Sequence, residues 1–325
     1  MTLRGLAVIG LVALASVGGR PVAGAPPGPG GGAMLPNLAP LPPFDVSVGP
    51  GDAPAEAVPH TLWGVPLTEP PGPALRFSTT VQNRGAYSLD LRALPAPDVV
   101  GTDVYAVALS QCVRFQPLLP GGAPRGCERY AEMGVVPYHP AHHHLHLDGL
   151  LRYELRRDAK GRPDLRGAGL VRASDKAGLC LSDMWDWRGD RVRDVGDPRA
   201  QAVFSAATAP AGRAWYRECS AHALAPAAGW RQGVSPGWLD TGFPYMPGQQ
   251  IPLAGVVDGV YWIVVTLNQP PRGKGPRLWE STWADNTAAS RIQVYGGGRK
   301  ARLLSPLPPA PNADWYDNPE DQPGD

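Results

Sequence analysis

The sequence predicts a mainly β protein, built around an antiparallel β-sandwich-like domain with long ordered loops and few short helices. Three observations lead to this fold class. Of 325 residues, 40 are Gly and 39 are Pro, and both disfavour helix interiors. Only 18% of the residues are charged, against roughly 25% in an average soluble domain. Short apolar runs alternate with turn residues, with no long amphipathic segment between them.

Five segments have the composition of β-strands, and the turn residues beside two of them support this assignment. The segment 75–81 runs into Asn83-Arg84-Gly85, and the segment 260–267 follows Val257-Asp258-Gly259. The run 260–267 is the strongest strand signal, because it is rich in β-branched and aromatic residues. The other strand-like segments are 103–109, 150–155 and 290–295. Several short strands separated by turns are typical of a sandwich.

The two ends of the chain differ in composition from its middle. Residues 1–25 predict a signal peptide, because Arg4 precedes an apolar run, 6–15, that is too short to span a bilayer. An uncleaved membrane anchor is the alternative. Residues 26–44 form a Pro/Gly-rich arm, and residues 297–325 a Pro-rich acidic tail that we expect to be disordered. A single folded domain, 45–296, remains.

Export predicts a secreted or extracytoplasmic location, which is an oxidising compartment where cysteines form disulfide bonds. The 4 Cys allow three pairings. We expect Cys180 to pair with Cys219 across a long loop, and Cys112 to pair with Cys127. The net charge of +1 provides no basic field for nucleic acid or anionic lipid. We therefore expect no nucleic-acid partner, and no membrane association once the signal peptide is cleaved.

A cluster of histidines is the clearest functional signal in the chain. Its members, all within eight residues, are His139, His142, His143, His144 and His146. On an extended segment His142, His144 and His146 share one face, and the first and third lie about 13 Å apart. Three imidazoles that can converge predict a copper or zinc site, and copper binds more tightly at equal geometry. A structural zinc site and a surface histidine-rich turn remain alternatives.

The histidine cluster, with Tyr153-Glu154-Leu155 after it, resembles the copper-binding segment of the lysyl oxidase family. Five more stretches resemble that family in the same order and together cover residues 34–296. They are Leu35-Pro36-Asn37-Leu38, the L-R-F-x-x-x-V-x-N-x-G pattern of 75–85, Lys176-Ala177-Gly178-Leu179-Cys180-Leu181-Ser182-Asp183, Gly233-Val234-Ser235-Pro236-Gly237-Trp238-Leu239-Asp240, and Glu280-Ser281 with Asp285-Asn286.

This resemblance implies a secreted copper amine oxidase that oxidises primary amines to aldehydes and releases ammonia and hydrogen peroxide. The implied partners are protein lysine side chains or small primary amines, and oxygen. The implied cofactors are copper, with His142, His144 and His146 as ligands, and lysine tyrosylquinone, which is made from a Lys and a Tyr of the chain itself. Lys176 falls at the position of the family's cofactor lysine. The quinone would accept electrons from the substrate amine.

The chain departs from the family at the cofactor tyrosine. That position is Gly242, and the nearest tyrosine is Tyr245. Three alternatives follow for the tyrosine ring of the quinone. Tyr245 supplies it through a rearranged loop, or Tyr216 supplies it from a distant part of the chain, or no quinone forms. In the last case the protein is a catalytically inactive copper-binding extracellular β-domain. A metal-dependent hydrolase is a third alternative. The candidates for a general base, which the sequence leaves open, are Asp148, Asp183, Asp240 and Glu280.

Overall fold

The computed structural model confirms a mainly β protein. It describes residues 31–51, 72–99, 105–116, 126–139, 144–145, 147, 150–175, 181–183, 185–186, 216, 230–244, 246, 248–268 and 278–305. Within these ranges the chain forms sixteen strands, and its only helix is a single 3-10 turn, η3, at Gly167–Gly169. Among the described residues, glycine and proline therefore have the effect expected from the composition.

The strands have the following bounds in chain order. They are β1 (Leu38–Pro40), β2 (Phe44–Pro50), β3 (Pro73–Asn83), β4 (Leu89–Val99), β5 (Tyr105–Phe115), β6 (Cys127–His139), β7 (His144–Leu145), β8 (Leu151–Arg157), β9 (Leu170–Asp175), β10 (Trp185–Asp186), β11 (Trp230–Val234), β12 (Trp238–Gly242), β13 (Gln250–Pro252), β14 (Gly259–Leu267), β15 (Thr287–Tyr295) and β16 (Lys300–Leu303). Each of the five strand segments expected from the sequence overlaps one of these strands, so their existence is confirmed.

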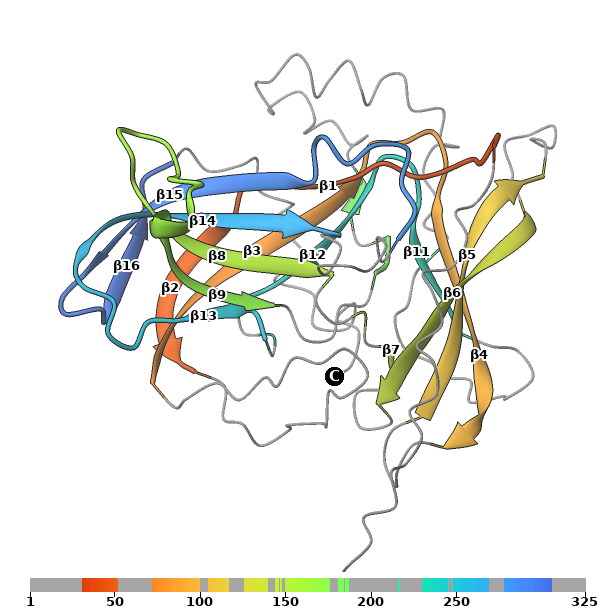
Figure 1. Cartoon of the computed structure of the whole chain (residues 1–325), viewed down its shortest axis with the longest axis horizontal. Coiled ribbons are helices and arrows are strands. Elements are labelled where there is room, and N and C mark those ends of the chain that lie inside the picture. The colour runs from red at the N-terminus through yellow and green to blue at the C-terminus, as the bar shows by residue number, and fades with distance from the viewer. Residues whose placement is uncertain are drawn as a thin grey trace, which may run out of the picture.

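The strands form three antiparallel sheets. The first has the order β1-β3-β12-β10, with β2 and β13 also paired to β3. The second has the order β11-β4-β5-β6-β7, and the third the order β16-β15-β14-β8-β9. In Figure 1 the second sheet lies at the right and the third at the left, with β12 of the first sheet between them. Strands β2, β13 and β1 of the first sheet contact strands of the third sheet, as in a sandwich.

Strand β3 is the centre of the first sheet, because it has partners along both edges. Strands β1 and β2 pair along one edge. Strands β12 and β13 pair along the other, with Gly242 opposite Thr79 and Gln250 opposite Arg76. The described residues between these two strands, 243, 244, 246, 248 and 249, therefore lie outside the ladder, and the two strands follow one another along the same edge of β3.

The core lies between the sheets and follows the alternation of the strands. In β8, Leu151, Tyr153 and Leu155 are buried, whereas the residues between them face outward. The Tyr153 ring packs edge-on against Phe77 of β3, with ring centroids 4.9 Å apart and planes at 83°. Burying one such side chain stabilises the fold by about 1.5–3 kcal/mol. Contacts of this kind hold the third sheet against the first.

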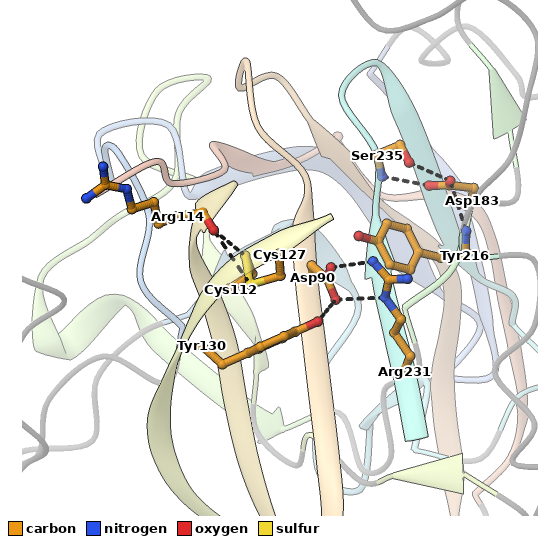
Figure 2. Close-up of polar contacts among 9 residues, drawn as sticks. All are labelled: Asp90, Cys112, Arg114, Cys127, Tyr130, Asp183, Tyr216, Arg231 and Ser235. Atoms are coloured by element: carbon orange, nitrogen blue, oxygen red, sulfur yellow. Dashed lines mark hydrogen bonds and ion pairs between the residues drawn. A yellow bond between two sulfur atoms is a disulfide. The ribbon is translucent and has the colours of Figure 1, made fainter. Parts of the chain in front are cut away.

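The second sheet contains a disulfide bond and an ion pair between the buried Asp90 and the exposed Arg231. Cys112 of β5 is bonded to Cys127 of β6, which confirms this expected pair; Cys180 and Cys219 lie outside the described residues. Figure 2 shows Asp90 of β4 close to this bond, where it accepts hydrogen bonds from Arg231 and Tyr130. Burial and the Asp90 charge raise the pKa of Tyr130 to about 12.

The folded body extends beyond residues 45–296 at both ends. Strand β1 lies within the Pro/Gly-rich arm, and its Leu38 is fully buried. Strand β16 lies within the tail segment and pairs with β15. From local composition we expected irregular chain at both places. Strands form there instead, because one edge of β3 and one edge of β15 offer backbone hydrogen-bond partners to β1 and β16. The acidic part of the tail, after residue 305, lies outside the described residues.

Candidate functional site

The histidine segment begins at the end of the second sheet. Strand β6 ends at His139, and β7 consists of His144 and Leu145. In the β6–β7 ladder His139 is the direct Cα partner of His144, so their Cα atoms are separated by about 4.5–5.5 Å. His142 and His146 lie outside the described residues. The structure thus adds one relationship that the spacing alone did not give, which is the register between His139 and His144.

The chain after the histidines enters the core directly. Leu147 and Leu150 are buried, and the Leu150 N–H donates to the Leu147 carbonyl at 3.1 Å. The Leu150 carbonyl accepts a hydrogen bond from the Asn268 N–H at 2.7 Å. Strand β8 begins at the next residue, Leu151. The C-terminal flank of the histidine segment is therefore fixed at one end of the third sheet.

Lys176 lies outside the described residues, but both of its flanks are described. It follows Asp175, the last residue of β9, which is the Cα partner of Arg152 near the start of β8. Because the two strands are antiparallel, the entry to Lys176 and the exit from the histidine segment lie at the same end of the sheet. The Ser174 hydroxyl also donates a hydrogen bond to the Gln250 carbonyl of β13.

The far flank of Lys176 is bound to β11 and β12. The Leu181 N–H donates to Oε1 of Gln232 at 3.0 Å, and the Leu181 carbonyl accepts from the Gly233 N–H at 3.0 Å. Asp183 accepts hydrogen bonds from the N–H and the hydroxyl of Ser235, both at 2.7 Å, as Figure 2 shows. The described flanks of Lys176 therefore lie at the end of β9 and beside the turn between β11 and β12.

Gly242 is the last residue of β12, and Tyr245 follows it by three positions in the sequence. Gly242 is buried and lies opposite Thr79 in the ladder with β3. Tyr245 itself lies outside the described residues. On one side of it the Pro244 carbonyl accepts from Nη1 of Arg76 at 3.1 Å, and on the other the Met246 N–H donates to the Phe243 carbonyl at 3.0 Å.

Gln249 fixes the C-terminal end of this loop in the core. Its side chain accepts a hydrogen bond from the Tyr153 hydroxyl and donates one to the Thr79 hydroxyl, each at 2.9 Å. Gln249 and Tyr153 are both fully buried. Burial also raises the pKa of the Tyr153 hydroxyl above its ordinary value, so this group stays a donor. The sequence analysis missed Gln249, because no local pattern marks a partner that is distant in the chain.

Tyr216, the alternative source of the ring, is a core residue. It is 6% exposed, and its ring lies against the guanidinium group of Arg231 at 5.4 Å, as Figure 2 shows. Its backbone N–H donates to Asp183 at 3.3 Å. Burial raises the pKa of its hydroxyl well above the ordinary value. A phenol in this environment is held in its neutral form, whereas oxidation of a tyrosine ring is easier from the phenolate.

Three of the four candidate bases have structural hydrogen bonds. Besides Asp183, Asp240 accepts from the N–H of Ser182 at 2.6 Å. Glu280 accepts from the Leu38 N–H and from the side-chain amides of Asn268 and Asn286. Burial raises the pKa of Glu280 to about 7, despite these three donors. Asp148 lies outside the described residues.

Within the described ranges no three His, Cys, Asp or Glu side chains are grouped so that they could hold a metal ion. Two of the three expected ligands are not in those ranges. Among the residues that the structure describes, no helix is long and apolar enough to cross a membrane. No protein-family model and no curated protein sequence matches the chain.

Proposed function

We propose that this protein is a secreted copper-dependent amine oxidase that converts the primary amines of peptidyl lysine, or small amines, to aldehydes. In the overall reaction one amine, one oxygen and one water give one aldehyde, one ammonia and one hydrogen peroxide. The amine carbon loses two electrons and oxygen gains them. His142, His144 and His146 bind the copper, and Lys176 and Tyr245 together form the quinone.

One observation carries the proposal: the flanks of the three candidate segments converge on Gln249 and Gln250, at the start of β13. Tyr153, seven residues after His146, donates to Gln249, four residues after Tyr245. Ser174, two residues before Lys176, donates to the carbonyl of Gln250. The two hydrogen bonds end on adjacent residues, although they join residues that are 96 and 76 positions apart in the sequence. Convergence of this kind is what formation of a cofactor from distant side chains requires.

The chemistry of the donor set fits copper. Imidazole nitrogens suit copper and zinc, and neutral three-nitrogen sites bind copper more tightly at equal geometry. When bound, copper would supply the one-electron oxidation that converts a tyrosine ring to a quinone. The contribution of the chain is to hold the ring and the Lys176 amine near each other in a site shielded from water, where the amine forms the crosslink and later substrates bind.

The test is mass spectrometry of copper-loaded protein from the culture medium. A crosslinked peptide that joins Lys176 to Tyr245 and a positive quinone stain are expected. Lys176→Ala and Tyr245→Phe should each remove the crosslink and the amine turnover, and the double variant should lose no more than either single variant, because the two residues act as a unit. A Tyr245→Phe protein that still oxidises amines would refute the role of Tyr245.

A second function is favoured by the position of Gly242. This residue is the last of β12 and is paired with Thr79 in the β3–β12 ladder, so a strand residue without a ring occupies the family's cofactor position. If the quinone does not form, the protein is a catalytically inactive copper-binding extracellular β-domain. Stoichiometric copper without crosslink or turnover in the wild-type protein is the result that would select this function over the oxidase.

A further inference from the structure

We propose that the outer face of the second sheet carries a binding site for the carboxylate group of an acidic peptide, formed by Arg92 of β4 and Arg231 of β11. Neither arginine is among the expected metal or cofactor residues. The site is therefore independent of the copper and the quinone, and it adds a binding function to the proposed oxidase.

The two arginines are direct neighbours across the β4–β11 ladder. Arg231 is the Cα partner of Arg92, so their Cβ atoms are about 4.5–5.5 Å apart on the same face of the sheet. Leu89 and Leu91 belong to the core, and the alternation of the strand therefore turns Arg92 outward. Arg92 is exposed, and the side chain of Arg231 is 54% exposed. Like charges directly opposite each other destabilise a sheet, so this pair favours a nearby negative charge.

One carboxylate serves the pair, and its hydrogen bonds go to Arg231 alone. The side chain of Asp90 has no exposed area, and it accepts hydrogen bonds from Nε and Nη2 of Arg231 at 3.1 and 2.6 Å. In the part of the chain that the structure describes, no carboxylate contacts Arg92. Two positive charges and one negative charge leave one positive charge in excess. A single carboxylate from a ligand would neutralise it.

Aromatic rings support both guanidinium groups. Arg231 lies 5.4 Å from the ring centroid of Tyr216, and Arg92 lies 5.9 Å from that of Tyr130. Figure 2 shows the Tyr216 ring beside Arg231 and the Tyr130 hydroxyl directed at Asp90. A guanidinium group against a ring keeps the N–H groups at its edge available for two parallel hydrogen bonds to a carboxylate. Because the rings restrict the arginines before binding, less side-chain entropy is lost when the ligand binds.

The charges around the pair favour a single carboxylate over a polyanion such as a sulfated polysaccharide. Glu132 of β6 lies in the same row of the sheet as Arg92, with Ser110 of β5 between them. At the usual strand spacing the two rows of backbone are about 10 Å apart. Glu128 of β6 is also exposed, and it pairs with Arg114 at 3.2 Å. These carboxylates would repel a chain of closely spaced sulfates, whereas an acidic residue flanked by uncharged residues meets mainly the excess positive charge.

The experiment is an NMR titration of the full-length protein, isotope-labelled at its arginines, with the peptide N-acetyl-Gly-Glu-Gly-amide. The side-chain Nε–H signals of Arg92 and Arg231 should both shift and saturate. Neither should shift with the same peptide carrying Gln in place of Glu. Arg92→Gln keeps the pair between Asp90 and Arg231, and it should weaken binding, followed on the Arg231 signal, about 10-fold or more, as loss of a charge-assisted contact predicts.

The matched control is Arg114→Gln. Arg114 is an exposed arginine of the adjacent strand β5, where it pairs with Glu128. This variant loses the same charge but should bind the peptide as tightly as the wild type does. Arg92→Gln should melt at the wild-type temperature or above it, because it removes one of two facing like charges.

These outcomes are separate from those that test the oxidase, since none depends on copper or on the crosslink. The site is overturned if the wild type shows no saturable shift, or if Arg92→Gln binds as tightly as the wild type. Equal weakening in Arg92→Gln and Arg114→Gln also overturns it, because general attraction to positive charge would explain both. A lower melting temperature of Arg92→Gln would assign the arginine to the fold instead. A heparin oligosaccharide that shifts the two signals at lower concentration than the peptide overturns the choice of ligand.

Discussion

The backbone N–H of Leu38 donates a hydrogen bond of 2.8 Å to Oε2 of Glu280, and so joins the first strand of the chain to the loop before β15. The other oxygen of Glu280 accepts from the side-chain amides of Asn268, at 2.6 Å, and Asn286, at 2.8 Å. These donors stabilise the carboxylate, but burial outweighs them. Glu280 is therefore a carboxyl group that folding drives toward its protonated form.

This behaviour predicts a fall in stability between about pH 4.5 and pH 7. Over this range the folded protein keeps the Glu280 proton that the unfolded chain, with a pKa near 4.5, has released. The free energy of unfolding decreases as pH rises through the window, by up to about 3 kcal/mol. Urea unfolding of copper-free protein at a series of pH values measures it, and Glu280→Gln should remove this slope.

Glu154→Gln is the control for that experiment. The adjacent Arg156 and Arg152 outweigh burial and lower the pKa of Glu154. The ionised Glu154 therefore stabilises the folded protein at pH values above the ordinary pKa of a glutamate. This stabilisation is lost as the pH falls below that value. The Glu154→Gln protein should keep the wild-type slope between pH 4.5 and pH 7. A slope that is unchanged in Glu280→Gln would contradict the assignment to Glu280.

The copper site is tested by replacing His142, His144 and His146 together with Ala, which should abolish stoichiometric copper measured by elemental analysis. His143→Ala is the control, because on an extended segment its side chain points away from the other three, and it should keep its copper. Since the ligands must be neutral, copper affinity should fall as pH drops below about 6.5. Retention of metal by the triple variant would show that the site is elsewhere.

Tyr216→Phe should keep both the crosslink and the amine turnover. Tyr216 is buried against Arg231, and burial holds its hydroxyl in the protonated form. Loss of that hydroxyl should reduce the free energy of unfolding by about 1 kcal/mol, which is typical of one hydrogen bond. Peptide mass spectrometry and chemical denaturation measure the two effects. Loss of the crosslink in a folded Tyr216→Phe protein would move the cofactor ring to Tyr216.

The cysteines should all be oxidised in protein from the culture medium. The Cys112–Cys127 bond closes a loop with a sequence separation of 15, for which the loss of unfolded-chain entropy predicts about 3 kcal/mol of stability. Replacing both with Ser should lower the free energy of unfolding by about this amount. Non-reducing peptide mapping should find the same pair, together with Cys180–Cys219. Titration of four reactive thiols would refute both bonds.

Much of the fold could be predicted from the sequence, because strand formation depends on near neighbours. The alternation of Leu151, Tyr153 and Leu155 and the apolar run of β14 are both readable without the structure. The boundaries were less accurate, and the sequence analysis named segments for only five of the sixteen strands. Among the strands that it did not predict are β1 and β16. These two short strands have no distinctive pattern of their own, and they form because β3 and β15 offer free edges.

The sequence by itself determined the fold class, the Cys112–Cys127 pair as an expectation, the histidine spacing and the absence of a tyrosine at residue 242. Only the tertiary structure decided that Gly242 and Gln250 lie on one edge of β3, and that Gln249 meets Tyr153, from which it is separated by 96 positions. Local patterns follow from backbone geometry over a few residues. Partners across sheets are selected by burial and by hydrogen bonds that must be satisfied in the core, and these constraints involve the whole chain at once.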